Sequence, residues 1–304
     1  MSEQPRFGRL LTAMVTPFAP DLSLDLPRAA ELARRLVDQG SEGLIVNGTT
    51  GESPTISRPE RMELFAAVRD AIGGQVPLIA NVGDNCTEDS VEFARKVAAL
   101  GVTALLVVTP YYNKPPQEGL YRHFRAVAEA TDLPVVLYNI PGRCVINIEP
   151  ETIVRLARDC SNIVAVKQAV SDMNQVDAIL AGTPADFEVL SGDDDLTLEM
   201  MKHGGSGVIS VTAHVAAGPM KKMIDAYVAG DLVTSEEINA ILSSLHKALF
   251  MTANPIMVKA ALRLDGFDVG GLRLPLIEAN ASQTIALREV MESVRAKLQA
   301  RNYC

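Results

Sequence analysis

The feature of this sequence that most restricts its fold is a series of short apolar runs. Their residues are mainly Val, Ile, Leu and Ala, and apolar and polar positions do not alternate regularly within them. A parallel strand with both faces covered requires this pattern, because the side chains on both faces are then buried. The runs are Leu10–Val15, Gly43–Val46, Pro77–Val82, Ala104–Val108, Pro134–Leu137, Ile163–Val166, Phe187–Leu190 and Gly207–Ile209.

Segments with helical periodicity separate these runs. Ser57 and Glu60 have the spacing of a capping box at the start of a helix, and Thr87–Ser90 predicts a capped first turn. Gly40 and Gly230 stand where helices are expected to end. One apolar stripe with the helical period is formed by Ala29, Leu32, Ala33, Leu36 and Val37.

Strands that alternate with helices along the chain predict an α/β fold, and eight of them predict a (β/α)₈ TIM barrel. A doubly wound open sheet is the alternative, but such a sheet usually has a glycine-rich turn after its first strand. The corresponding turn here, Thr16–Ala19, contains no glycine. The barrel is therefore favoured.

The last part of the chain has a different pattern. No further strand run follows Gly230, and three helices are expected at Ser235–Phe250, Pro255–Leu264 and Leu276–Leu298. We therefore expect residues 1–230 to form the barrel with the active site. Residues 231–304 are expected to form a C-terminal helical domain.

Composition excludes several classes of function. The net charge of −9 argues against a nucleic-acid surface, which needs clustered Lys and Arg, and no apolar run approaches the length of a membrane span. The N-terminus shows no signal-peptide pattern, and the four cysteines form no CxxC pair, so a cytoplasmic protein with free thiols is expected. No metal is expected, because the four histidines have no metal-ligand spacing.

Residues suited to catalysis follow several of the predicted strands, and this is where the active sites of such barrels lie. Lys167 directly follows Ile163–Val166. Burial there lowers the pKa of a lysine and leaves free amine that can attack a carbonyl. The alternative is a lysine that leaves the barrel and pairs with an acid. Tyr138 follows the neighbouring run and can move protons during Schiff-base formation, which favours a lysine-dependent aldolase.

Two further loops contain groups that can bind carboxylates. Gly48–Gly51 offers backbone N–H groups and two hydroxyls in a tight turn, although many ordinary turns have the same composition. Arg143 lies five residues after Tyr138 and can bind a carboxylate through two hydrogen bonds, although on its position alone a solvated surface arginine is the better explanation.

The combination of these segments, in this order, is similar to one known family. The chain resembles the dihydrodipicolinate synthases, which belong to the pyruvate-dependent aldolase superfamily together with N-acetylneuraminate lyase. The resemblance extends from about residue 8 to the C-terminal helices, and its segments are specific only jointly. They are Thr12–Pro17, Gly48–Ser53, Val108–Asn113, Tyr138–Pro141, Arg143, Val166–Lys167, Ser191–Asp194, Gly207–Thr212 and Asn254–Pro255.

This resemblance implies catalytic roles for four residues. Lys167 would form the Schiff base with pyruvate. Tyr138, Thr49 and Tyr112 would form the proton relay, and Tyr112 would reach the active site of a neighbouring subunit. The family is typically a homotetramer, a dimer of tight dimers, in lysine (diaminopimelate) biosynthesis. No metal or organic cofactor is expected, because the lysine supplies the electron sink.

The resemblance also implies which residues bind the substrates. Thr50, with the adjacent backbone at Gly48, would hold the carboxylate of pyruvate. Arg143 would bind the carboxylate of L-aspartate 4-semialdehyde, and the carbonyl of Ile209 would face the site. The product of this condensation is 4-hydroxytetrahydrodipicolinate.

The chain departs from the family pattern at several positions. Cys144 stands where threonine is common, and Gln168 stands where an acid is usual. In members that lysine inhibits, an interface pocket often contains histidine and glutamate. A corresponding regulatory pocket here would contain Ser53, Arg58, Asn85, Asp89 and Tyr111. In this pocket Arg58 and Asp89 stand where those members have the histidine and the glutamate. We therefore expect weak or absent inhibition by lysine.

Two other functions compete with this interpretation. One is another aldolase of the superfamily with a different aldehyde acceptor, such as a sugar, against which Arg143 argues because sialic acid lyases generally lack it. The other is a non-catalytic barrel that binds a keto acid. The presence of Lys167, Tyr138, Thr49 and Tyr112 together argues against that function.

Overall fold

The computed structural model describes residues 5–303, so the parts of the domain predictions that concern residues 1–4 and Cys304 lie outside the described residues. The strands β1 to β8 are arranged in sequence order in a closed parallel barrel. This confirms the predicted TIM barrel, and the open sheet was the wrong alternative. The chain forms two compact units, and each is described by itself below.

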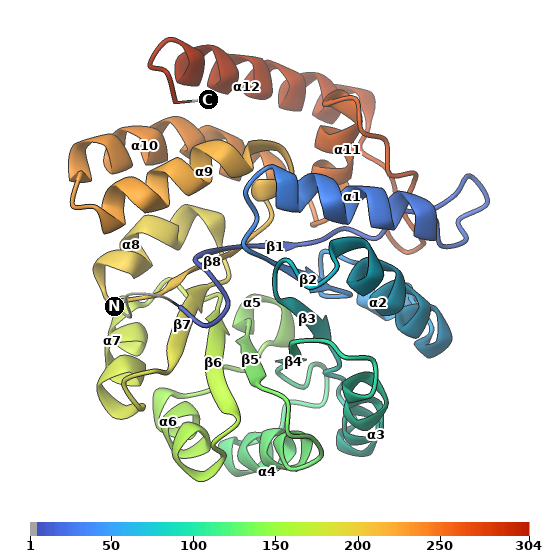
Figure 1. The fold of residues 1–304 in the computed structure, drawn as a ribbon, viewed down its shortest axis with the longest axis vertical. Helices are drawn as coiled ribbons and strands as arrows, with labels where there is room; N and C mark the ends of the chain where they lie inside the picture. The colour runs from blue at the N-terminus through green and yellow to red at the C-terminus, as the bar shows by residue number, and fades with distance from the viewer. Residues whose placement is uncertain (1–4, 304) are drawn as a thin grey trace. The chain divides into compact units, whose positions relative to one another are not determined.

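The first unit contains residues 77–209 and the N-terminal segment up to Arg9. Figure 1 shows helices α3, α4, α6 and α7 of this unit on the outer side of its strands. Its elements are β3 (Leu78–Asn81), α3 (Thr87–Ala98), β4 (Ala104–Val108), α4 (Gln117–Ala128), β5 (Val135–Asn139), α5 (Pro141–Cys144), α6 (Pro150–Asp159), β6 (Ile163–Gln168), α7 (Met173–Gly182), β7 (Glu188–Ser191), η2 (Asp194–Leu196), α8 (Thr197–Lys202) and β8 (Gly207–Ser210), whose last residue belongs to the second unit.

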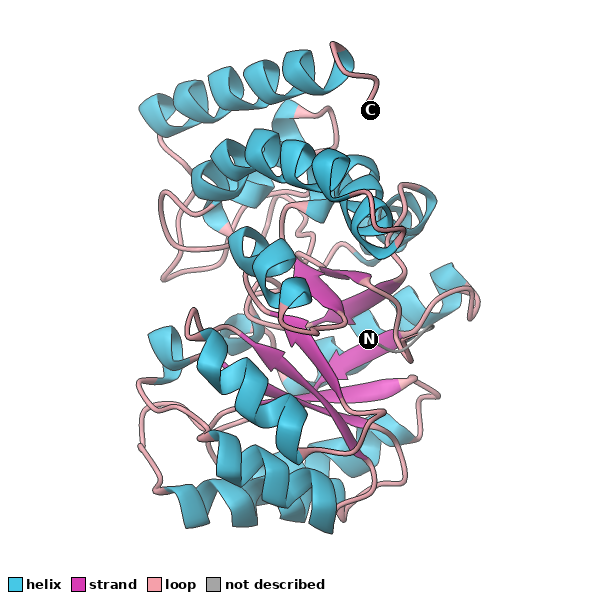
Figure 2. Cartoon of the chain, turned by 90° about the vertical axis from the view of Figure 1, so that its left-hand side faces the viewer, coloured by secondary structure: helices cyan, strands magenta, loops and turns pink. Residues whose placement is uncertain are grey.

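The second unit contains residues 10–76 and the chain from Ser210 onwards. The predicted C-terminal helices are present, and α10 packs between α9 and α12, as Figure 1 and Figure 2 show. The boundary proposed at residue 230 stays a prediction. The elements are β1 (Leu10–Ala13), α1 (Leu26–Asp38), β2 (Gly43–Val46), η1 (Ser53–Thr55), α2 (Arg58–Ile72), α9 (Ala213–Val228), α10 (Leu232–Leu249), α11 (Ile256–Leu264) and α12 (Ala281–Gln299).

The predicted strands differ from the observed strands only at their ends. The largest difference that matters for function is in β6, which extends beyond Val166 to include Lys167 and Gln168. The strand side chains are almost all buried, as expected for parallel strands covered on both faces. Lys167 is therefore part of a regular strand, and its direction is fixed by the strand.

Of the two helix starts predicted from capping residues, one prediction is confirmed and one is wrong. The capping box of Ser57 and Glu60 is present at the start of α2, so this prediction is confirmed. The predicted capped turn at Thr87 is wrong, because Cys86 occupies the cap position and its side chain makes no capping bond. The hydroxyl of Thr87 instead shares a hydrogen bond of 2.9 Å with Nδ1 of His123 in α4. A contact with another helix has replaced the local cap.

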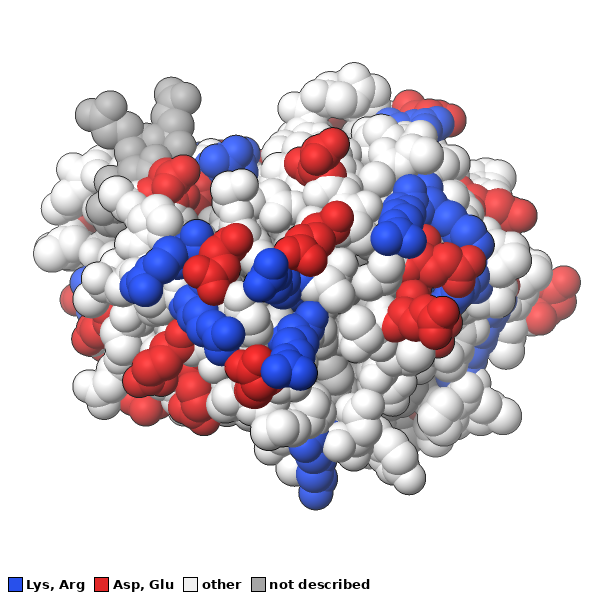
Figure 3. All heavy atoms as spheres, turned by 90° about the horizontal axis from the view of Figure 1, so that it is seen from below, with Lys and Arg blue, Asp and Glu red and all other residues white. Residues whose placement is uncertain are grey.

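Surface charges of both signs are mixed on the face that carries α4 and α6. Figure 3 shows basic and acidic side chains interspersed on this face. Glu118 illustrates the pattern, because it pairs with Arg122 at 2.9 Å and with Arg155 at 2.7 Å. This face therefore offers no continuous positive patch for a phosphate backbone. Within residues 5–303, no helix is both long enough and apolar enough to span a membrane.

Candidate active site

Lys167 and Tyr138 lie next to each other in the first unit. They are paired positions in the register of β6 and β5. Nζ of Lys167 lies 4.3 Å from the centroid of the Tyr138 ring, and the two residues are 5% and 4% exposed. The parallel register therefore brings together the predicted nucleophile and the predicted proton carrier.

The backbone at Tyr138 is held by the neighbouring strand. Its carbonyl accepts hydrogen bonds from the backbone N–H and the hydroxyl of Thr109, at 2.9 and 2.8 Å. The thiol of Cys144 donates to the carbonyl of Thr109 at 3.2 Å. Burial raises the pKa of Cys144 to about 11, so this residue is a protonated hydrogen-bond donor at neutral pH. A threonine hydroxyl, which is common in the family at this position, could donate the same hydrogen bond. The replacement of threonine by Cys144 therefore preserves a donor to the carbonyl of Thr109.

The environment of Lys167 favours the free amine. The pKa of Lys167 is lowered to about 8, chiefly by burial and in smaller part by the positive charge of Arg143, while Asp194 and Asp193 act in the opposite direction. At pH 7 a pKa of about 8 leaves about a tenth of the amine unprotonated, whereas an ordinary lysine leaves less than about a thousandth. Lys167 can therefore attack a carbonyl at neutral pH.

Asp194 is a member of this site to which sequence analysis gave no role. It is 1% exposed in η2, directly after β7, and its charge favours the protonated form of Lys167. Ser191 shapes the preceding turn, because its hydroxyl donates to the carbonyl of Asp193 at 2.7 Å. The position of the Ser191–Asp194 segment at a strand end was the available signal, because active-site groups collect there.

The other predicted residues of the first unit lie on its strands and loops. Arg143 is exposed in α5, where its charge still acts on Lys167. Ile209 is buried in β8. Tyr112 is 87% exposed and has a left-handed backbone with a φ of 76°. Gln168 points to the face of β6 opposite to Lys167, since strand side chains alternate, and it accepts a hydrogen bond from Asn139 at 3.0 Å.

The predicted carboxylate-binding turn belongs to the second unit. Gly48, Thr49 and Thr50 follow β2, with Thr50 buried and Thr49 half-buried. The N–H of Gly51 donates to the carbonyl of Gly48 at 3.0 Å, which closes the turn. A Cβ at Gly51 would lie 3.0 Å from Cα of Asn47, so only glycine fits there without displacement. The sequence pattern therefore predicted a tight turn correctly.

Sequence analysis gave no role to the residues that hold this turn, although Asn254 lies in one of the segments that carry the family resemblance. Asn254 donates a hydrogen bond from Nδ2 to the hydroxyl of Thr50 at 2.8 Å, and Lys259 forms an ion pair with Glu52 at 2.7 Å. A weak signal existed for Lys259, which is a single charge within the apolar stretch Ile256–Leu262 of α11. A buried lysine in such a stretch requires a partner, but the sequence does not identify it.

The residues of the predicted regulatory pocket occur in both units. In the first unit, the hydroxyl of Tyr111 and the backbone N–H of Asn85 both donate to Asp84, at 3.3 and 2.7 Å, and Asp89 is half-buried in α3. In the second unit, Ser53 begins η1 and Arg58 begins α2. The structure thus places Tyr111 and Asn85 together, and their regulatory role stays a prediction.

No group of three or more His, Cys, Asp or Glu side chains within residues 5–303 has the arrangement of a metal site.

Comparison with known proteins identifies the family. The sequence matches the dihydrodipicolinate synthetase family over residues 6–294. This chain belongs to that family. A relative from Symbiobacterium thermophilum, named 4-hydroxy-tetrahydrodipicolinate synthase, is 55% identical over 287 residues, which are 94% of this chain and 98% of the relative.

Solved structures of the family have the same fold. A crystal structure of DHDPS from Cyanidioschyzon merolae with lysine bound is 45% identical and has a TM-score of 0.94, with 96% of this chain and 99% of that chain covered. A structure described as the first monomeric dihydrodipicolinate synthase variant is 43% identical and has a TM-score of 0.92, with coverage of 95% and 97%. The resemblance inferred from the sequence is therefore confirmed.

Proposed function

We propose that this protein is a 4-hydroxy-tetrahydrodipicolinate synthase, a lyase that condenses pyruvate with L-aspartate 4-semialdehyde in lysine and diaminopimelate biosynthesis. The observation that carries the proposal is the buried Lys167 beside the ring of Tyr138, with the pKa of the lysine lowered to about 8. The name shared by relatives that cover nearly the whole chain supports the choice of substrates.

The reaction begins at the amine of Lys167. The free amine adds to the ketone carbon of pyruvate, and the carbinolamine loses water to form an iminium ion. The positive iminium nitrogen withdraws electrons, so a methyl proton is lost and an enamine forms. We assign the proton transfers to Tyr138, Thr49 and Tyr112, because phenol and hydroxyl groups can pass a proton in both directions.

The enamine then forms the new carbon–carbon bond. Its nucleophilic carbon attacks the aldehyde carbon of the second substrate, and the resulting alkoxide takes up a proton. The amine of that substrate adds to the iminium carbon and displaces Lys167, which closes the six-membered ring of 4-hydroxytetrahydrodipicolinate. The iminium formed on Lys167 is the electron sink for loss of the methyl proton and the electrophile for ring closure, so we propose that the reaction requires no metal or organic cofactor.

Substrate binding is assigned to the two carboxylate-binding groups. Thr50 and the backbone at Gly48 bind the carboxylate of pyruvate, and the carbonyl of Ile209 faces the reacting atoms. Arg143 binds the carboxylate of aspartate semialdehyde. Its exposed guanidinium is available for two parallel hydrogen bonds, which suit a carboxylate.

The assembly and regulation of the enzyme are also part of the proposal. We propose a cytoplasmic homotetramer in which Tyr112 reaches a neighbouring subunit, and the 87% exposure of Tyr112 supports a role outside its own chain. We also propose weak or absent inhibition by lysine, because Arg58 places a permanent positive charge, and Asp89 a shorter acid, where inhibited members have histidine and glutamate. Inhibition at sub-millimolar lysine would contradict this part.

The function is tested by turnover with both substrates. The product is consumed by dihydrodipicolinate reductase, and oxidation of NADPH reports its formation. We expect turnover by the wild-type protein and a loss of about 10⁴-fold or more in Lys167→Ala, because the covalent route is removed. Lys247→Ala, at an exposed position of α10, is the matched control and should retain the wild-type rate. Lack of turnover, with pyruvate still bound covalently to Lys167, would direct the search to other aldehydes.

A further inference from the structure

The turn that contains Thr49 and Thr50 has an unusual backbone at both ends. Asn47 and Glu52 have left-handed backbones, with φ values of 59° and 58°. Asparagine adopts this conformation comparatively readily, but for a residue such as Glu52 it is uncommon and costs energy that surrounding contacts must offset. The hydrogen bonds within the turn join Gly51 to Gly48 and Glu52 to Thr49, and these do not fix the side chain of Glu52. Other contacts must therefore hold the end of the turn.

Lys259 provides one of these contacts from α11. The side chains of Lys259 and Glu52 are 2% and 1% exposed, and their ion-pair distance is 2.7 Å. Lys259 also donates to the carbonyl of Gly271 at 2.7 Å, and the second carboxylate oxygen of Glu52 accepts from the N–H of Arg273 at 3.0 Å. The carboxylate of Glu52 is thus fixed by α11 and by the segment that follows it.

Asn254 provides the second contact, at the hydroxyl of Thr50. Asn254 and Thr50 are both buried, and the amide of Asn254 donates to the hydroxyl oxygen at 2.8 Å. Since that oxygen is already the acceptor, the hydroxyl hydrogen of Thr50 is directed to another acceptor. A carboxylate ligand is an acceptor without donors, so Asn254 prepares Thr50 to bind one.

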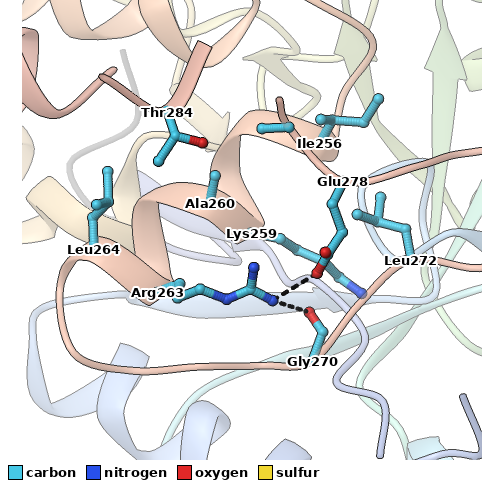
Figure 4. Close-up of a pocket in the computed structure, with 10 residues that line it drawn as sticks. Ile256, Lys259, Ala260, Arg263, Leu264, Gly270, Leu272, Glu278 and Thr284 are labelled. Carbon is cyan, nitrogen blue, oxygen red and sulfur yellow. Dashed lines mark hydrogen bonds and ion pairs between the residues drawn. The ribbon is translucent and has the colours of Figure 1, made fainter. Parts of the chain in front are cut away.

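Stability alone explains the buried ion pair poorly. Removal of two charges from water is costly, and a pair of apolar side chains often stabilises a core equally well. The nearby cavity measures about 50 Å³, well below the roughly 300 Å³ or more of sites for drug-sized ligands, so it offers Lys259 no ligand of that size. Figure 4 shows Arg263, one turn further along α11, making its separate contacts with Glu278 and Gly270 at this cavity.

We propose that Asn254 and Lys259 are positioning residues for the reaction with pyruvate, acting through Thr50 and Glu52 on the Gly48–Glu52 turn. This inference rests on the proposed function, because the turn is assigned there to pyruvate. The C-terminal helical segment thereby contributes to catalysis without contacting the substrate. We expect their replacement to lower activity about 10–100-fold, which is the range typical of residues that orient metal ligands.

The experiment follows exchange of the methyl protons of pyruvate for deuterium in D₂O, by proton NMR, with the full-length protein. This reaction needs the Schiff base and the proton relay but no aldehyde. We expect Asn254→Ala and Lys259→Met to lower the exchange rate about 10–100-fold. Arg263→Gln removes an exposed ion pair from the same helix and should retain the wild-type rate. Wild-type rates in both Asn254→Ala and Lys259→Met would overturn the inference.

A double-mutant cycle separates positioning from general destabilisation. If Asn254 acts through Thr50, Asn254→Ala should lower the rate less than about twofold further in a Thr50→Val background. An undiminished effect there would show that Asn254 does not act through Thr50. If Lys259→Met does not fold, the double variant Glu52→Gln/Lys259→Met is used in its place, because it removes both charges of the ion pair. We expect the same loss of exchange in this double variant. Wild-type exchange in a folded double variant would contradict the role of the ion pair.

The outcomes also separate this inference from the proposed function. Exchange by the wild-type protein without condensation with aspartate semialdehyde would overturn the proposed function but not the positioning roles. Condensation by the wild-type protein, with unimpaired exchange in the variants, would overturn the positioning roles alone. Absence of exchange in the wild-type protein would overturn both.

Discussion

Two buried lysines, one in each unit, have different surroundings. Lys167 and Lys259 are 5% and 3% exposed, and burial lowers the pKa of both. Lys259 is paired with Glu52 at 2.7 Å, whereas the neighbouring group at Lys167 is the ring of Tyr138. Asp194 and Asp193 raise the pKa of Lys167, but burial outweighs them and the pKa stays at about 8. Burial that outweighs nearby carboxylates leaves a reactive amine, and a buried lysine in a direct ion pair is held in place by its partner.

The two regions also differ in what determines their geometry. Tyr138 and Lys167 lie on adjacent strands, so the register of β5 and β6 places them together. The turn at Thr50 depends on contacts with residues of the C-terminal helical segment, such as Asn254, which is 204 residues away in the sequence. One region takes its geometry from regular strand pairing, and the other takes it from individual side-chain contacts.

After the loss of Lys167 itself, the largest effect is expected at Tyr138. Tyr138→Phe keeps the ring beside Lys167 but removes the phenol, so the turnover rate should fall about 10²–10⁴-fold while the protein remains folded. Steady-state kinetics and circular dichroism measure the two properties. Tyr227→Phe, in α9, is a control for the same substitution outside the site. A loss of less than tenfold in Tyr138→Phe would show that proton transfer does not depend on this hydroxyl.

The ion pair of the second region is tested by unfolding. Lys259→Met leaves the carboxylate of Glu52 buried without its partner, and should lower the free energy of unfolding by about 3–5 kcal/mol. Glu52→Gln/Lys259→Met removes both charges and should recover most of this loss. Urea denaturation measures both values. If the double variant were as unstable as the single variant, the cost would arise from packing rather than from an unpaired charge.

The smallest effect is expected for the shift in the pH midpoint of Schiff-base formation when charges near Lys167 are removed. With the pKa of Lys167 at about 8, the amine is protonated below this pH and free above it. The rate of Schiff-base formation should therefore rise about tenfold per pH unit up to about pH 8 and then become constant. Because the charge of Arg143 lowers this pKa and that of Asp194 raises it, Arg143→Gln should move the midpoint up and Asp194→Asn should move it down. Stopped-flow measurements with pyruvate at several pH values provide the test, and unchanged midpoints in both variants would contradict it.

The difference between strand pairing and individual side-chain contacts also explains which features could be predicted from the sequence. The eight apolar runs predicted the strands because burial on both faces leaves a local pattern, and the positions of Lys167 and Tyr138 at strand ends followed from it. The partners of Glu52 and Thr50 could not be predicted, because a side-chain contact between distant segments leaves no periodic pattern. The wrong cap at Thr87 has the same cause, since His123 of another helix contacts its hydroxyl.

The central claim is that Lys167 is the nucleophile, because burial lowers the pKa of its amine to about 8 beside the ring of Tyr138. The most direct test is reduction with borohydride in the presence of pyruvate, followed by mass spectrometry of the digested protein. We expect a reduced pyruvate adduct on Lys167 and an unmodified Lys259. An adduct on Lys259, or no adduct on either lysine, would contradict the claim.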